Sequence, residues 1–504
     1  MNYSFTLFKM KRYTYGIFQT VTGILLTAAI LSSCEDFLNQ VPGDKITPDQ
    51  HYKTSIDAYT STLGAYSILQ EVMPDLVILN DLRSDLMTET ENFDRDLRNI
   101  NRHNINIYNK YNDPSGYYRV IMNANEVLNN LADIQTHDRD FDSLSLRYAT
   151  IDMVSLRSWA YFTLVRLYGE AAYIPQDMNS YDENYQFEYY TKERMIDTLI
   201  SQLDSSFTYP DRYIESDLED TKQSKLLYER ALRGELYLEK GDYQKASSCF
   251  MDAIGDADIR TRFKMGDYTD EDWKDIFSNS AEQLSEVMSA IPFAYEDNQE
   301  NPLADIFYAD REYLAKPSDY IVDLYSIQTT QENETGDTYR GKGVSYDYDS
   351  IRDRLVVNKY SINLNEFSGA DIIIYRAADI FLLLAEALNQ MGEFDAALSI
   401  LNDGYTDPPG WRRVDGIRNR VLLTEREMPA SDIMNSIEDM IMEERAMELA
   451  FEGKRWFDLV RVANRRGESY LAGKVSAKYD DPSVASSVYN KLMDKSNWYL
   501  PFNK

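Results

Sequence analysis

Trp411 stands on a polar turn rather than in an apolar helix. It follows Asp407-Pro408-Pro409-Gly410 and precedes Arg412-Arg413. An indole in such a place can stack on the C–H face of a pyranose ring and can donate a hydrogen bond from its N–H. Packing against the protein interior is the alternative interpretation. Trp411 is therefore a candidate sugar platform.

Tyrosine is the most over-represented residue type, with 39 of 504 positions. Most of these side chains are expected to pack between helices, where an aromatic face fills a seam. Tyr295, Tyr308 and Tyr313 differ, because they lie among Asp, Asn and Glu in a segment without helical period. We expect at least one of them to stack on a ligand.

A second polar and aromatic cluster lies nearer the N-terminus. Asp81, Arg83 and Asp85 occur in NDLRSDLMTET, and Tyr108 and Tyr111 follow. Arg and Asp can each engage two hydroxyls of one sugar ring, whereas a solvated loop is the alternative interpretation. The candidate ligand-binding residues are Asp81, Arg83, Tyr108, Tyr295, Tyr308 and Trp411.

Common catalytic signatures do not occur in the sequence. It contains no His-Glu-x-x-His, Gly-x-Ser-x-Gly, Walker phosphate loop or Cys-x-x-Cys, and its three histidines share no metal-ligand spacing. We therefore expect no catalysis, no cofactor and no motif-based metal site. An acid pair of a glycoside hydrolase would leave no motif among 84 carboxylates, so that alternative stays open.

Charge narrows the choice of partners. The formal net charge is −32. Such a surface repels phosphate backbones, so we expect no nucleic-acid partner.

The residues before Cys34 have the order of a secretory signal. A basic start (Lys9, Lys11, Arg12) precedes an uncharged apolar run that ends in Leu31-Ser32-Ser33-Cys34. This order predicts a lipoprotein signal peptide at 1–33, with lipid on Cys34. A polar lipidated tether at 34–50 and a single domain at 51–504 complete the predicted organisation.

Helical spacing supplies the elements that position the candidates. We expect helices over 56–69, 120–131 and 143–169, and another over 432–451 that stops at Gly453. Two segments also share the spacing of a tetratricopeptide unit, in which two antiparallel helices cross at small residues. The first set is Gly234, Tyr237, Gly241, Tyr243, Ala246, Phe250 and Ala253; the second is Ala385, Leu388, Gly392, Phe394, Ala397 and Leu401.

These matches predict units near 225–258 and 377–409, on which the other helices stack. Between the units, near 260–370, the helical period fades. Such an irregular insertion on a helical frame is where binding residues tend to lie.

The most charged motif is EERAMELAFEGKRWFDLVR at 443–461. Its acidic and basic residues lie on adjacent turns and can pair with each other, and Trp456 and Phe457 can anchor them. We interpret it as a structural clasp rather than a ligand site. Trp159 and Trp273 lie in apolar helical contexts and are expected in the core.

Five segments together resemble the SusD/RagB family of Bacteroidetes outer-membrane lipoproteins. They are CEDFLNQVPGD at 34–44, LRSWAYFTLVRLYGE at 156–170, IYRAADIFLLLAEALNQMGEFDAAL at 374–398, EERAMELAFEGKRWFDLVR at 443–461 and NWYLPFNK at 497–504.

The resemblance implies a mostly α fold. About four tetratricopeptide-like helix pairs would form the frame, and long irregular loops and insertions would form the ligand face. It also implies a lipid-anchored outer-membrane protein that faces the cell exterior. Such a protein would capture oligosaccharides for a SusC-like TonB-dependent transporter, without catalysis. A peptide-binding RagB-like protein with the same partner, a lipid-anchored glycoside hydrolase and a tetratricopeptide adaptor remain as alternatives.

Overall fold

The structure is a computed structural model that describes residues 51–178, 185–206, 228–255, 273, 276–277, 286–293, 300–360, 370–405 and 415–503. It divides into one unit up to Lys53 and a second from Thr54 onward, and the second is described here. Cys34 and the predicted signal peptide lie outside the described residues, as does most of the chain up to position 53.

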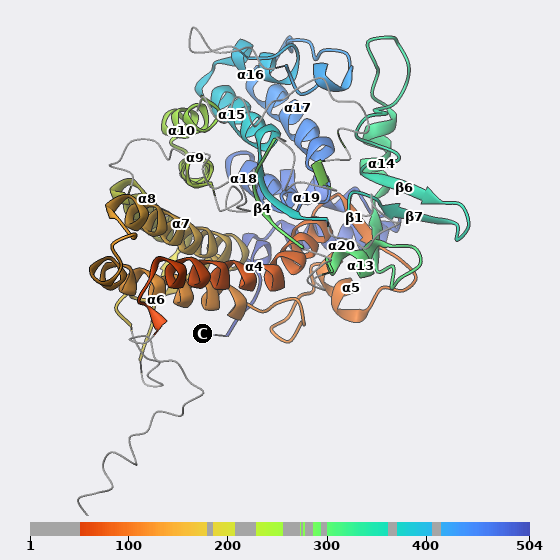
Figure 1. The fold of residues 1–504 in the computed structure, drawn as a ribbon. Helices are drawn as coiled ribbons and strands as arrows, with labels where there is room; N and C mark the ends of the chain where they lie inside the picture. Colours follow the sequence, from red (N-terminus) through yellow and green to blue (C-terminus); the bar gives the residue numbers. More distant parts are fainter. Residues whose placement is uncertain are drawn as a thin grey trace, which may run out of the picture. The chain divides into compact units, whose positions relative to one another are not determined.

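Four helices of the N-terminal half pack in chain order, each on the next (Figure 1). They are α4 (Ser55–Arg83), α6 (Ser115–His137), α7 (Ser143–Tyr168) and α8 (Lys192–Ser206). Thr54 and Asp57 form a capping box that starts α4. Gly169 ends α7 with a φ of 79° that favours glycine. The helices expected over 56–69, 120–131 and 143–169 are confirmed, and the first two are longer than expected.

A pair of adjacent helices lies within each of the two predicted tetratricopeptide units. The first is α9 (Glu229–Lys240) with α10 (Tyr243–Gly255), and the second is α15 (Ala377–Met391) with α16 (Phe394–Leu401). A two-residue turn joins each pair. At Gly234 of α9 an added Cβ would lie 2.3 Å from the Phe250 ring of α10, so the close crossing requires glycine.

Cys249 lies on α10 and is buried. Burial raises the pKa of its thiol to about 11. The thiol is therefore an inert part of the packing between helices.

The C-terminal helices return the chain to α4. They are α17 (Ile433–Glu448), α18 (Arg455–Arg466), α19 (Glu468–Ser476) and α20 (Pro482–Leu492). Helix α17 packs on α15, and α18 packs on α4. The sequence predicted a helix over 432–451, but α17 ends at Glu448, so the predicted end is wrong. Phe451 then takes a φ of 66°, a left-handed conformation that a helix cannot contain.

Strands are short and occur as four antiparallel pairs. They are β1 (Met87–Glu89) with β5 (Ala315–Pro317), β2 (Glu170–Tyr173) with β3 (Glu188–Thr191), β4 (Val287–Ile291) with β8 (Ile372–Arg376), and β6 (Tyr346–Asp349) with β7 (Arg354–Val357). The predicted irregular insertion contains three of these pairs in part or whole.

Short helices complete the described fold. They are α5 (Arg95–Asn101), α13 (Leu303–Phe307), α14 (Asp319–Ser326), η3 (Asn419–Val421) and η4 (Lys495–Trp498). Trp159 and Trp273 are buried, as expected for core residues. No helix in the described part of the chain is long and apolar enough to cross a membrane.

Candidate ligand-binding site

The charged motif at 443–461 joins distant segments inside the protein. Glu448, at the end of α17, accepts hydrogen bonds from Arg340 Nη1 (2.9 Å) and Arg376 Nη1 (2.7 Å), and it also pairs with Arg420. Arg376 Nη2 donates to Glu452 Oε1 as well (2.9 Å). Helix α17 is thus tied to the insertion and to β8.

We use the term buried ionic network for ten linked charged residues among those described. They are Glu286, Asp337, Glu444, Glu448, Glu452, Arg340, Lys359, Arg376, Arg418 and Arg420. All ten are buried, and the five acidic and five basic residues balance in charge. Burial alone would raise the pKa of Glu448, but Arg420, Arg376 and Arg340 overcome this effect and lower it to about 2.

Two arginines of the motif, Arg455 and Arg461, also form buried ion pairs. Arg455 binds both carboxylate oxygens of Asp85, each at 2.8 Å. Arg461 binds Glu386 (2.7 Å) and Asp458 (2.7 Å). The interpretation as a structural clasp is confirmed. The expected pairing within the motif holds for Asp458 with Arg461, whereas Glu448, Glu452 and Arg455 pair with distant residues.

Asp81 and Arg83 belong to the same clasp. Asp81 Oδ2 accepts the Gly453 N–H at 2.9 Å, and burial raises the pKa of Asp81 to about 7. The Arg83 guanidinium lies 4.1 Å from the Trp456 ring centroid, and Nη2 donates to the Trp498 carbonyl. Both side chains are fully buried. The expectation that they touch ligand is therefore corrected, because both side chains lie inside the protein. Their partners are close to the C-terminus, so the local sequence could not reveal this burial.

The other candidates are divided between the interior, the surface and the undescribed residues. Tyr308 is buried, and its hydroxyl donates to the Tyr360 carbonyl at 2.6 Å. Tyr108 is 85% exposed in the loop between α5 and α6. Tyr295 and Trp411 lie outside the described residues, so their expected roles stay predictions.

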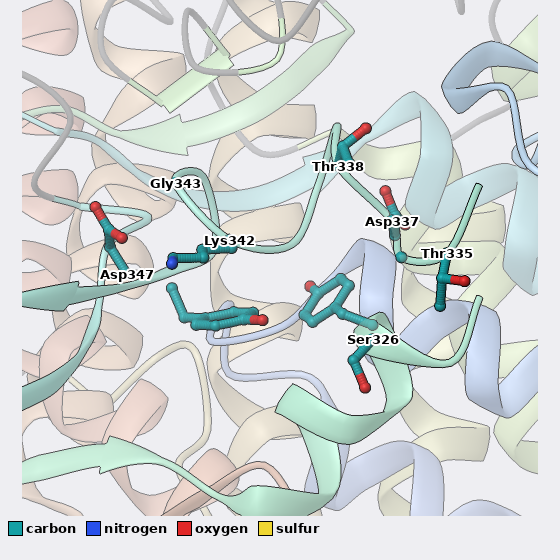
Figure 2. Close-up of a pocket in the computed structure, with 10 residues that line it drawn as sticks. Ser326, Thr335, Asp337, Thr338, Lys342, Gly343 and Asp347 are labelled. Atoms are coloured by element: carbon teal, nitrogen blue, oxygen red, sulfur yellow. The ribbon is translucent and has the colours of Figure 1, made fainter. Parts of the chain in front are cut away.

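A hollow between α14 and β6 gathers groups that the sequence reasoning did not single out. Its volume is about 530 Å³. Figure 2 places Lys342 and Asp347 on one side of it, and Thr335 and Thr338 on the other. The lining residues are Tyr325, Ser326, Thr335, Gly336, Asp337, Thr338, Lys342, Gly343, Tyr346 and Asp347.

Two tyrosines form the aromatic part of this hollow. The ring centroids of Tyr325 and Tyr346 are 5.8 Å apart, and the rings are tilted by 35°. The Tyr325 hydroxyl contacts the Met447 carbonyl (2.5 Å) and Ser345 Oγ (3.1 Å). The first contact fixes the Tyr325 ring to the C-terminal end of α17. Tyr346 is 8% exposed.

The polar rim of the hollow is open to solvent. Ser326, Thr335, Thr338 and Lys342 are exposed, and Asp347 is half-buried. Among the described residues, no carboxylate forms an ion pair with the Lys342 ammonium. By contrast, Asp337 at the back of the hollow accepts a hydrogen bond from Arg340 Nε at 2.7 Å. The hollow therefore combines a fixed aromatic floor with rim donors and acceptors that can bind a polyhydroxylated molecule.

The sequence carries a faint signal for this site. Tyr346 and Tyr348 alternate with Asp in SYDYDS, the period of a strand with one aromatic face. Tyr325 gives no local signal, because only the fold brings α14 against β6. Within the described residues, no group of His, Cys, Asp and Glu could hold a metal ion.

Comparison with known proteins assigns this architecture to a family. Residues 240–503 match the profile of the SusD family, and the chain belongs to that family. The resemblance inferred from the sequence and the mostly α, tetratricopeptide-like fold are thus confirmed.

Individual relatives extend the match to most of the chain. SusD-like protein P38 of Formosa agariphila is 24% identical and covers 94% of this chain and 96% of its own. A solved SusD superfamily protein from Bacteroides vulgatus superposes with a TM-score of 0.71 at 16% identity, over 89% of this chain and 96% of that one. A solved laminarin-binding SusD-like protein gives 0.61 at 17% identity, over 86% and 95%.

Proposed function

We propose that this protein is a glycan-binding lipoprotein of the cell surface that holds an oligosaccharide in the hollow between α14 and β6. The observation that carries the proposal is the Tyr325 and Tyr346 pair beneath an open polar rim. Family membership supports it, and so does the laminarin-binding relative. The proposal involves no chemical step on the glycan.

The finer parts of the proposal follow from the family resemblance. Lipid on Cys34 would anchor the protein to the outer membrane, on the side that faces the cell exterior. A SusC-like TonB-dependent transporter would receive the captured oligosaccharide. Co-purification of such a transporter with the lipidated protein, and its loss on Cys34→Ala, would support both parts.

Binding at this hollow should be of moderate strength. An aromatic face contributes about 0.5–1.5 kcal/mol beyond its buried area, and each net hydrogen bond contributes about as much. An open site of this kind should give roughly micromolar to millimolar affinity after the entropy cost of binding.

The test uses the soluble protein from residue 35 in native gels that contain single polysaccharides, with laminarin first. Retardation of the wild-type protein is expected. Tyr346→Ala should weaken binding about tenfold, because it removes the stacking face. Lys342→Ala changes the rim alone, and should weaken binding less without changing the melting temperature.

The matched control is Tyr489→Ala, which removes a partly exposed tyrosine on α20, outside the hollow. It should bind as the wild-type does. If Tyr346→Ala and Lys342→Ala both bind as the wild-type protein does, the assignment of the site is contradicted. Binding of peptides in place of all glycans would favour the RagB-like alternative, and release of product would indicate a hydrolase.

A further inference from the structure

The strand that forms one wall of the hollow continues beyond it. Tyr346 lines the hollow, and Tyr348 lies two residues further along β6. Side chains two residues apart on a strand project from the same face, about 7 Å apart. Tyr348 therefore carries the aromatic face of the hollow outward. Unlike Tyr346 it is 46% exposed.

The pairing of β6 with β7 separates this face from the opposite one. Tyr346 pairs with Val357 and Tyr348 with Leu355, so these four residues share one face of the hairpin. Arg354 belongs to the opposite face, where its guanidinium lies 4.5 Å from the Tyr313 ring centroid. Tyr346 and Val357 are buried at the inner end of the tyrosine face, whereas its outer end, at Tyr348, is open to solvent.

The Tyr348 ring is held in place by the tip of the hairpin. Its hydroxyl donates to the Asp353 carboxylate. Asp349 Oδ1 accepts the backbone N–H groups of Ile351 (2.9 Å) and Arg352 (3.0 Å), which closes the turn. An aromatic ring that is already ordered loses little entropy when a ligand stacks on it.

The base of the hairpin is fixed as well. Tyr313 donates its hydroxyl proton to the Leu355 carbonyl at 2.8 Å, and Arg354 Nη1 donates to the Ala309 carbonyl at 2.6 Å. Asn358 Nδ2 donates to the Gly343 carbonyl in the wall of the hollow at 3.0 Å. Figure 1 shows β6 and β7 extending past the neighbouring helix α14. The hairpin is a rigid extension of the hollow.

We infer that Tyr348 is an outer stacking platform, and that the site takes a glycan chain which runs from the hollow along the tyrosine face of the hairpin. This inference rests on the proposed function and adds a ligand class to it. The ligand is an extended oligosaccharide or polymer segment rather than a mono- or disaccharide. A short ligand fills the hollow alone, whereas a longer one reaches Tyr348.

The experiment measures affinity against ligand length by calorimetry. The probe is a series from disaccharide to octasaccharide cut from laminarin, or from another polymer that retards the wild-type protein. Wild-type affinity should rise with length. Tyr348→Ala should leave disaccharide affinity within about twofold and lower octasaccharide affinity about fivefold, as expected for one stacking contact. Tyr346→Ala should weaken all lengths.

Two controls separate stacking from other effects. Tyr348→Phe keeps the ring and loses the hydroxyl, so it should retain most of the gain with length. Ile351→Ala removes an 89% exposed side chain at the tip and should change no affinity. If Tyr348→Ala binds long ligands as the wild-type does, the inference is overturned while the hollow stands. If the wild-type protein binds no glycan of any length, both proposals are overturned.

Discussion

The buried ionic network and the hollow between α14 and β6 lie next to each other, but they differ in whether their polar side chains are exposed to solvent. In the network, the acidic and basic side chains are buried and paired with one another. In the hollow, Lys342 and the rim hydroxyls face solvent. The density of charge therefore does not identify a binding site in this protein. The candidate site is marked instead by rim side chains that face solvent.

The two regions are nevertheless connected. Asp337 pairs with Arg340 in the network and also lines the hollow. Tyr325 lines the hollow and contacts the Met447 carbonyl, one residue before Glu448. The network thus holds in place the floor on which the proposed ligand would rest, and Asp337 and Tyr325 form the boundary between the two regions. Substitutions on one side of this boundary should change stability, and substitutions on the other side should change binding.

The largest effect is expected from Arg376→Met, which removes one cation from the network. Glu448 and Glu452 would remain buried with fewer partners, so the free energy of unfolding should fall by about 3–5 kcal/mol. Urea denaturation would measure the loss. The control is Arg119→Ala, since Arg119 forms an exposed pair with Glu71 and should change stability by less than about 1 kcal/mol. Similar losses in both variants would contradict the contrast between buried and exposed pairs.

The second-largest effect is expected from acid pH, which should lower the free energy of unfolding. Burial alone would raise the pKa values of Asp379 and Glu386, but Lys454 with Arg445 and Arg461 with Arg465 lower them to about 2, as for Glu448. Because these folded-state values lie below the unfolded ones, the stability they provide is present above about pH 4.5 and is lost as the pH falls toward 2.

Urea denaturation at pH 5 and pH 3 checks this expectation, and the free energy of unfolding should be several kcal/mol lower at pH 3. Asp81 opposes the trend, because burial raises its pKa to about 7 and its contribution grows as the pH falls toward 4. An unfolding free energy that is equal at the two pH values would show that the paired carboxylates do not dominate.

The smallest effect is expected at the boundary, from Tyr325→Phe. This change removes the hydroxyl that contacts the Met447 carbonyl and keeps the ring in the hollow. Stability should fall by about 1–2 kcal/mol, whereas glycan affinity should stay within about twofold. Denaturation and calorimetry on the same sample separate the two. A large loss of affinity without a loss of stability would mean that the hydroxyl touches ligand.

The sequence predicted the parts of the fold that depend on neighbouring residues. Gly234 and Phe250 belong to two helices joined by a short turn, so their spacing alone indicated the crossing. The partners of the charged residues in the clasp could not be predicted from local spacing. Arg376 and Glu448 are 72 positions apart, and Asp81 reaches Gly453 across 372 positions. A polar local sequence such as NDLRSD therefore suggested an exposed cluster, although the fold buries it.

The hollow lies in the region where the sequence led us to expect binding residues, but it is lined by other residues than those singled out. The insertion near 260–370 contains the hollow, as expected for an irregular segment on a helical frame. Tyr308 was singled out there, yet its hydroxyl is bonded inside the fold. Tyr325 and Tyr346 were missed, because their juxtaposition depends on the packing of α14 against β6. Tyr295, Trp411 and Cys34 remain predictions.

The burial of Cys249 makes the protein well suited to optical labelling. A chain that begins at residue 35 has this one cysteine, which is buried on α10, and burial raises the pKa of its thiol to about 11. Maleimide reagents require an accessible thiolate, so they should react slowly with it. Ile351→Cys would then place a single fast-reacting thiol at the tip of the β6–β7 hairpin. A fluorophore attached there would report ligand arrival near Tyr348 in real time, without substitution of Cys249.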